Sequence, residues 1–175
     1  MKDGNHYVTG NFQSHAIFLD EETYSKALDS LVIACVDIVL LNDSKIFLAK
    51  RKRHPQKDWW IVGGRMSPGE SIEQTAQRNS KRELNLELAP NRFKFLTVFS
   101  AVWDKRAHKP SENGSHTISI VETIEVTKDE TELISINDEY EEFKWLYPKE
   151  IIEGDYHPAI KECATRILEK ANRGV

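Results

Sequence analysis

Residues 63–86 of the chain read GGRMSPGESIEQTAQRNSKRELNL, and this stretch decides which fold is expected. Two adjacent glycines are followed by a Ser-Pro-Gly turn. The run behind the turn contains no Gly or Pro and predicts a helix over residues 71–84, with Ser67 and Pro68 as its start signals. Asn85 can adopt the left-handed conformation that ends a helix. The stretch therefore predicts a glycine loop that leads into one helix.

The spacing of residues in this stretch resembles the Nudix box, in which a glycine is followed at fixed intervals by a glutamate, an Arg-Glu pair, a Glu-Glu pair and a last glycine. Four positions match the family: Gly64, Glu70, Arg78 and Glu83. Three positions differ, because two box glutamates and the last glycine are replaced by Asn79, Arg82 and Asn85. The loss of these two glutamates is similar to the GDP-mannose mannosyl hydrolase branch of the Nudix family. That resemblance extends from about residue 19 to residue 150.

The composition is that of an ordinary globular chain. Its 175 residues are 39% hydrophobic and 30% charged, which suffices for one domain with its own core. The net charge of −4 gives no sign of a nucleic-acid-binding face. One basic run, residues 50–54, is interpreted as a solvated strand end that acidic segments balance.

The cysteine and hydropathy patterns point to a location in the cell. Cys35 and Cys163 have neither metal-ligand spacing nor a CxxC partner, so both are expected to be buried in a reducing compartment. No apolar stretch has the length of a membrane span, and the polar N-terminus does not resemble a signal peptide. We therefore expect a cytoplasmic protein that binds neither membrane nor nucleic acid.

Alternating strand and helix patterns predict an α/β protein. Strands are expected at residues 31–41, 45–51, 59–62, 93–103, 115–126 and 143–146, and helices at 20–29, 71–84, 148–152 and 157–171. Residues 1–18 are interpreted as a polar N-terminal extension and residues 19–175 as a single domain. The resemblance implies that this domain is a Nudix-type α/β/α sandwich with a mixed β-sheet.

A divalent cation, Mg2+ or else Mn2+, is the cofactor that the resemblance implies, because a hard cation neutralises the diphosphate of the substrate. The predicted metal ligands are the carbonyl of Gly64 and the carboxylates of Glu83 and Glu139. On the predicted helix, Asn79 and Glu83 lie four residues apart and share one face. One carboxylate and one amide on that face suit a single cation.

The substrate that the resemblance implies is a nucleoside diphosphate sugar, GDP-mannose above all. Water would attack the anomeric carbon, and GDP would leave with its charge stabilised by arginines and the cation. The predicted substrate-binding residues are Asp37, Arg65, Arg78 and His116. The predicted catalytic residues are Arg65, Arg78, Glu83 and Tyr140. An ion pair with Glu70 is the alternative role for Arg78.

The general base is not decided by the sequence. Tyr140 falls on the place of the branch's catalytic histidine, counted back from Trp145, but a phenol with a pKa near 10 is a poor base at neutral pH. The carboxylates of Asp138, Glu141 and Glu142 could replace it.

Two other functions stay open. The chain could be a Nudix-fold module that binds a nucleotide without hydrolysing it, since box glutamates and the histidine base are missing. It could also cleave the diphosphate at phosphorus with a base placed elsewhere. The resemblance further implies a homodimer, which the N-terminal extension could help to form.

Overall fold

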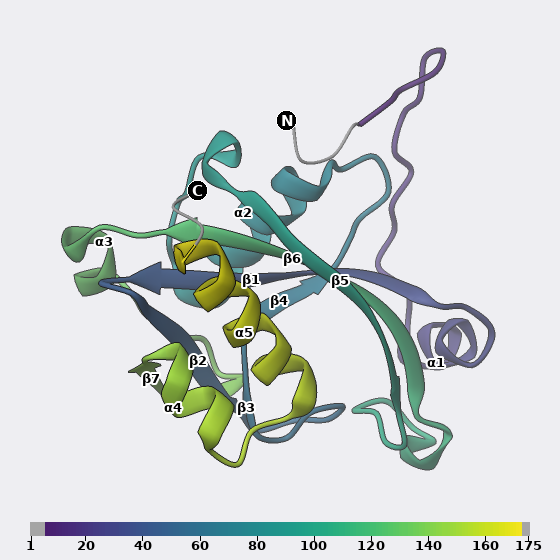
Figure 1. Ribbon diagram of the computed structural model, residues 1–175. Coiled ribbons are helices and arrows are strands. Elements are labelled where there is room, and N and C mark those ends of the chain that lie inside the picture. The colour runs from purple at the N-terminus through teal and green to yellow at the C-terminus, as the bar shows by residue number, and fades with distance from the viewer. Residues whose placement is uncertain (1–5, 173–175) are drawn as a thin grey trace.

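The computed structural model describes residues 6–172, which form one mixed β-sheet with helices on both faces (Figure 1). The strands are β1 (Ile33–Asn42), β2 (Lys45–Arg51), β3 (Trp59–Trp60), β4 (Val62–Arg65), β5 (Lys94–Trp103), β6 (Ser115–Glu125) and β7 (Tyr140–Leu146). Their order is β3-β2-β1-β6-β5, with β4 paired to β1 and β7 paired to β2. Strands β1 and β6 are parallel, and the other pairs are antiparallel. The predicted sandwich around a mixed sheet is confirmed.

The helices are α1 (Glu21–Ser30), α2 (Ile72–Leu84), α3 (Lys128–Glu132), α4 (Pro148–Glu153) and α5 (Pro158–Asn172). In Figure 1, α5 crosses one face of the sheet, and α2 lies behind the sheet. The sequence did not predict α3, because a five-residue helix is too short to show a hydrophobic period. Short 3-10 turns cover Pro90–Arg92 and Ser111–Asn113.

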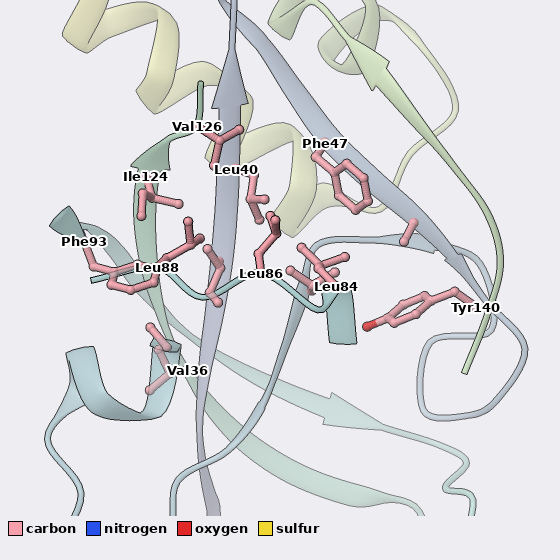
Figure 2. Close-up of a cluster of buried hydrophobic side chains, with 14 residues drawn as sticks. Val36, Leu40, Phe47, Leu84, Leu86, Leu88, Phe93, Ile124, Val126 and Tyr140 are labelled. Atoms are coloured by element: carbon pink, nitrogen blue, oxygen red, sulfur yellow. The ribbon is translucent and has the colours of Figure 1, made fainter. Parts of the chain in front are cut away.

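The side chains of β1 alternate between two buried clusters, as a strand covered on both faces requires. Val36, Ile38 and Leu40 belong to the cluster on the α2 side, whereas Val39 and Leu41 pack with residues of α4 and α5. Figure 2 shows the first cluster, in which Leu84, Leu86 and Leu88 at and behind the end of α2 meet Phe47 and Ile124 from the sheet. Burial of each of these side chains contributes about 1.5–3 kcal/mol.

Helix ends follow the local sequence. The Asp20 carboxylate accepts a hydrogen bond from the backbone N–H of Thr23 at 2.9 Å and caps α1. Helix α2 is capped by Ser71, where the predicted range begins, because Ser71 and Gln74 exchange side-chain and backbone hydrogen bonds; the start signals Ser67 and Pro68 precede this cap. Asn85 ends the helix at φ 57°, which confirms the expected left-handed conformation.

The remaining expectations concern the chain ends and the cysteines. Residues 6–20 contain no helix or strand; residues 1–5 of the predicted extension and 173–175 of the predicted domain lie outside the described part. Cys163 is buried as predicted, whereas Cys35 is only partly buried because it faces a cavity. Within residues 6–172, no helix has the length and apolar character of a membrane span.

Candidate functional site

The inner face of α2 carries two polar side chains that are almost fully buried. Asn79 is 0% exposed and Glu83 is 1% exposed. They lie one helical turn apart and meet the glycine loop in β4, so the predicted shared face is present. Buried polar groups need hydrogen-bond partners, and both side chains have them.

Both carboxylate oxygens of Glu83 accept hydrogen bonds. Oε2 accepts from the backbone N–H of Gly63 at 3.0 Å and from the hydroxyl of Tyr140, and Oε1 accepts from the guanidinium of Arg82. Burial, and then the charge of Glu83, raises the pKa of Tyr140 well above 10. Tyr140 therefore keeps its proton and orients Glu83.

Asn79 acts as a donor toward the sheet. Its Nδ2 donates to the carbonyl oxygens of Val36 and Gly64, both at 3.1 Å. Its Oδ1 accepts from Nη1 of Arg78 at 3.1 Å. The amide thus fixes the glycine loop against β1 and occupies the Gly64 carbonyl.

The guanidinium of Arg78 binds the segment that leads into α2. Its Nε and Nη2 donate to the two oxygens of Glu70 at 2.6 and 2.7 Å, and Nη2 also donates to the carbonyl of Arg65 at 2.9 Å. The Arg78 hydrogen bonds hold the pKa of Glu70 at about 2, against the opposing effect of burial. This is the alternative role expected for Arg78, and the guanidinium braces the loop between β4 and α2.

A cavity of about 300 Å3 opens beside this loop. Guanidinium groups from four parts of the chain line it: Arg51, Arg53, Arg65, Arg82 and Arg106. His54 and His108 add to them, whereas Asp37 and Glu139 are the two carboxylates in the lining. A wider groove of about 980 Å3 shares most of these residues and adds Lys52 and Lys57. The site is therefore strongly basic in a chain whose net charge is −4.

The other walls are aromatic and hydroxylic. Trp60 and Trp103 lie edge to face, with ring centroids 5.5 Å apart. The guanidinium of Arg65 stacks over Tyr24 of α1 at 4.6 Å. Ser115, Thr117 and Ser119 alternate along β6 and turn one face of that strand to the cavity.

Asp37 is a buried residue of the cavity lining, on β1 opposite Gly63. Burial raises the pKa of its carboxyl to about 7, against the effect of a hydrogen bond with Ser119, and the charge of Glu83 adds to the rise. A carboxyl with this pKa exchanges its proton near neutral pH, which suits an acid or a base.

Arg106 is the most buried arginine of the cavity lining, at 2% exposure. Its guanidinium donates to Asp29 at 2.6 Å, to the hydroxyl of Ser25 at 2.7 Å and to the carbonyl of Gly114 at 3.1 Å. It ties the loop between β5 and β6 to α1, and α1 thereby closes one side of the cavity.

The structure brings most predicted site residues together. Asp37, Gly64, Arg65 and Glu139 line the cavity, and Glu83 and Tyr140 lie directly behind the glycine loop. The other two predicted residues, Arg78 and His116, lie neither in the lining nor directly behind the loop. Arg78 is bound to Glu70, and His116 is on the opposite face of β6 from Ser115 and Thr117, where its Nε2 is 2.8 Å from Oγ of Ser100. For His116, the alternation of side chains along a strand explains the difference.

The sequence missed several basic residues. The run 50–54 was interpreted as a solvated strand end, but Arg51, Arg53 and His54 also line the cavity, and Arg51 and His54 are only partly exposed. Lys50 does fit that interpretation, since it pairs with Glu141 at 3.3 Å. One signal in the sequence could have indicated this role: Arg51, Arg53 and His54 cluster at the end of the strand that comes shortly before the glycine loop.

The predicted metal ligands do not fit a divalent cation in this arrangement. Each oxygen of Glu83 already accepts a hydrogen bond, and the Gly64 carbonyl accepts one from Asn79. Glu139 lies 3.8 Å from Arg51, and within residues 6–172 no group of three or more His, Cys, Asp or Glu could hold a metal. Mg2+ prefers open oxygen ligands in octahedral geometry, which these donors do not offer.

Comparison with known proteins defines the class. A model of the NUDIX domain matches residues 33–167, so the chain belongs to the Nudix family. NAD-capped RNA hydrolase NudC of Vibrio atlanticus is 29% identical over 62 residues, which cover 35% of this chain but only 23% of that relative. Nucleoside triphosphatase NudI of Escherichia coli (strain K12) is 24% identical over 104 residues, 59% of this chain and 72% of the relative.

Solved structures show the same fold. A MutT NUDIX hydrolase from Burkholderia pseudomallei superposes with a TM-score of 0.62 at 21% identity, over 78% of this chain and 98% of the other. The NUDIX domain of Shewanella oneidensis NrtR, solved in complex with ADP ribose, gives a TM-score of 0.60 at 17% identity, over 87% and 99%. At these identities the likeness concerns the fold alone.

Proposed function

We propose that the chain is a Nudix hydrolase of a nucleoside diphosphate derivative. The observation that carries the proposal is the convergence of Arg51, Arg53, Arg65 and Arg82 on one cavity, beside the Arg106 guanidinium that the protein itself engages. Guanidinium groups bind phosphate oxygens through paired hydrogen bonds. Moreover, the buried Nε of Arg51 has no hydrogen-bond partner within residues 6–172, so an acceptor from a ligand would satisfy it.

Cleavage that releases the nucleoside diphosphate intact is the reaction that this site supports best. Water would attack the anomeric carbon of a nucleoside diphosphate sugar, the bond from that carbon to the diphosphate oxygen would break, and the electron pair would leave with the diphosphate. Arginines fixed around the cavity would stabilise that departing charge. The first substrate to test is GDP-mannose, on the resemblance of the box to the mannosyl hydrolase branch.

The proton of the attacking water needs an acceptor. Asp37 and Glu139 are the carboxylates in the cavity lining, and Glu139 faces Arg51 at 3.8 Å. Tyr140 is not available because its pKa is raised by burial and by Glu83. Comparing Asp37→Asn with Glu139→Gln identifies the acceptor, since only the loss of the true base lowers kcat by about 100-fold or more.

Phosphorus NMR of the reaction products tests the proposed function. Incubation with GDP-mannose and other nucleotide sugars should give a nucleoside diphosphate as the only new phosphorus species. Nucleoside monophosphate plus sugar phosphate would show the ordinary cleavage at phosphorus instead. Unchanged spectra for every nucleotide sugar would contradict a hydrolase of this class.

A binding module is the second candidate function, favoured by the full engagement of Glu83 with protein donors. Such a module would be stabilised thermally by a nucleoside diphosphate or by ADP-ribose and would leave both unhydrolysed. The retained cavity carboxylates, Asp37 and Glu139, favour the enzyme.

A homodimer remains part of the proposal. Residues 6–20 expose Tyr7, Ile17 and Phe18, which are 81%, 76% and 99% exposed. Large exposed apolar side chains are candidates for contact with another chain. Light scattering of the full chain, compared with a variant that lacks residues 1–18, tests whether this segment forms a dimer.

A further inference from the structure

Arg82 brings a positive charge to a place where the Nudix box carries a glutamate. Its Nη2 donates to Oε1 of Glu83 and also approaches the carbonyl oxygen of Gly63 at 3.3 Å. The Arg82 side chain is 45% exposed, so the same guanidinium is anchored on one side and open to the cavity on the other.

The glycine loop is shaped around this guanidinium. A Cβ added to Gly64 would lie 2.6 Å from Nη2 of Arg82, so the guanidinium would have to move away from its present position. The absence of a side chain at Gly64 therefore allows the guanidinium to lie directly against the loop backbone. Glu83, the loop carbonyl and the open space at Gly64 together hold the charge in one position.

We propose that the Arg82 guanidinium takes the place of a metal ion in this site, and that a nucleoside diphosphate binds here without a divalent metal. The inference rests on the proposed function and concerns how the diphosphate is held. The guanidinium contacts the carboxylate and lies beside the glycine loop, the groups expected to hold a cation. Asn79 also disfavours a metal ion, because its amide donates a hydrogen bond to the Gly64 carbonyl that a metal would need as a ligand.

The positive charges around Arg82 favour the binding of an anion in the cavity. Arg65 faces the cavity from β4 and packs on the ring of Tyr24. Arg51 lies 3.8 Å from Glu139, and Arg53 lies 3.7 Å from the exposed Asp138, so both keep donors for a ligand. The exposed ion pair between Arg53 and Asp138 is weak and exchanges readily for a phosphate.

Calorimetric titration of GDP into the full-length protein, in EDTA and in Mg2+, tests the inference. We expect dissociation constants that agree within about threefold in the two buffers, roughly 0.7 kcal/mol. Mn2+ titrated alone and followed by electron paramagnetic resonance should show no tight site. GDP binding that requires Mg2+ would overturn the inference and leave the proposed function standing, whereas absence of GDP binding in both buffers would overturn both.

Two variants sharpen the result. Arg82→Glu restores the family's carboxylate and should weaken GDP binding in EDTA at least tenfold while creating a tight Mn2+ site. Lys81→Glu is the matched control, because it makes the same charge change on α2 at an exposed side chain that pairs only weakly with Glu87 at 3.9 Å. Equal losses in both variants would overturn the role of Arg82. If Arg82→Glu does not fold, Arg82→Gln should show the same loss of GDP binding in EDTA.

Discussion

The hydroxyl of Tyr140, the first residue of β7, donates a hydrogen bond to Oε2 of Glu83 on α2. This contact links two segments that the sequence places far apart and fixes the only carboxylate on the inner face of the helix. In Figure 2 the oxygen of Tyr140 points toward the end of α2 near Leu84. Tyr140 thus positions Glu83.

Replacing Tyr140 with Phe should destabilise the protein by about 1–3 kcal/mol, because the buried carboxylate of Glu83 loses a donor and cannot reach water. Urea denaturation measures the change. Tyr7→Phe, at an exposed tyrosine, is the control and should alter the free energy of unfolding by less than about 0.5 kcal/mol. Equal stability of Tyr140→Phe and the wild type would mean that the contact does not matter.

Arg65→Ala should weaken the binding of a nucleoside diphosphate by about 10- to 100-fold, since hydrogen bonds to charged groups contribute roughly 1.5–3 kcal/mol. Calorimetric titration measures the affinity. The control is Arg166→Ala on α5, where an exposed arginine pairs with Glu162 in the same helix. Unchanged affinity in Arg65→Ala would remove this residue from the phosphate site.

The two loop glycines should respond differently to alanine. At Gly63 the new Cβ would lie 2.6 Å from the carbonyl oxygen of Val36, a backbone atom that cannot move away, so we expect a loss of about 1–3 kcal/mol in stability. At Gly64 the obstacle is the flexible end of Arg82, so stability should change little while nucleotide affinity falls. Thermal denaturation and calorimetric titration separate the two effects; the reverse pattern would contradict the placement of Arg82.

Asp37 should make stability fall as the pH rises. Folding raises the pKa of this carboxyl from 3.8 to about 7, so the folded state holds the proton more tightly. Its favourable contribution is complete below about pH 4 and is lost as the pH rises through about 7. Asp37→Asn mimics the neutral form.

The unfolding temperature of Asp37→Asn, relative to the wild type, should therefore rise between pH 4.5 and pH 8. The expected rise is at least about 2–4 °C, the equivalent of roughly 1 kcal/mol for a chain of this size. Asp155→Asn, at an exposed residue, should show no such trend. A flat difference in Asp37→Asn would show that the carboxyl is not buried as described.

The sequence predicts the elements of this fold well because each has a local cause. The cap at Asp20, the uninterrupted run of α2 and the left-handed Asn85 are all properties of neighbouring residues. The exact start of α2 was harder, since Ser67 and Ser71 both precede the helix and only the reciprocal bonds of Ser71 with Gln74 decide between them.

The site was only partly predictable, because its remaining features depend on distant contacts. Nothing local indicates that Arg106 is buried, since its partners Ser25 and Asp29 belong to α1. The strand face of His116 depends on the register between β5 and β6. The engagement of Glu83 by Tyr140 becomes visible only when β7 and α2 are placed in space.

Hydrolysis of GDP-mannose in 18O-labelled water tests the central claim most directly. The nucleotide product, examined by phosphorus NMR or mass spectrometry, reveals which bond water attacked. Our account predicts GDP that carries no 18O, because water attacks the sugar carbon and the diphosphate leaves intact. Label on any phosphate of the nucleotide product or of a sugar phosphate would place the attack at phosphorus and contradict the account.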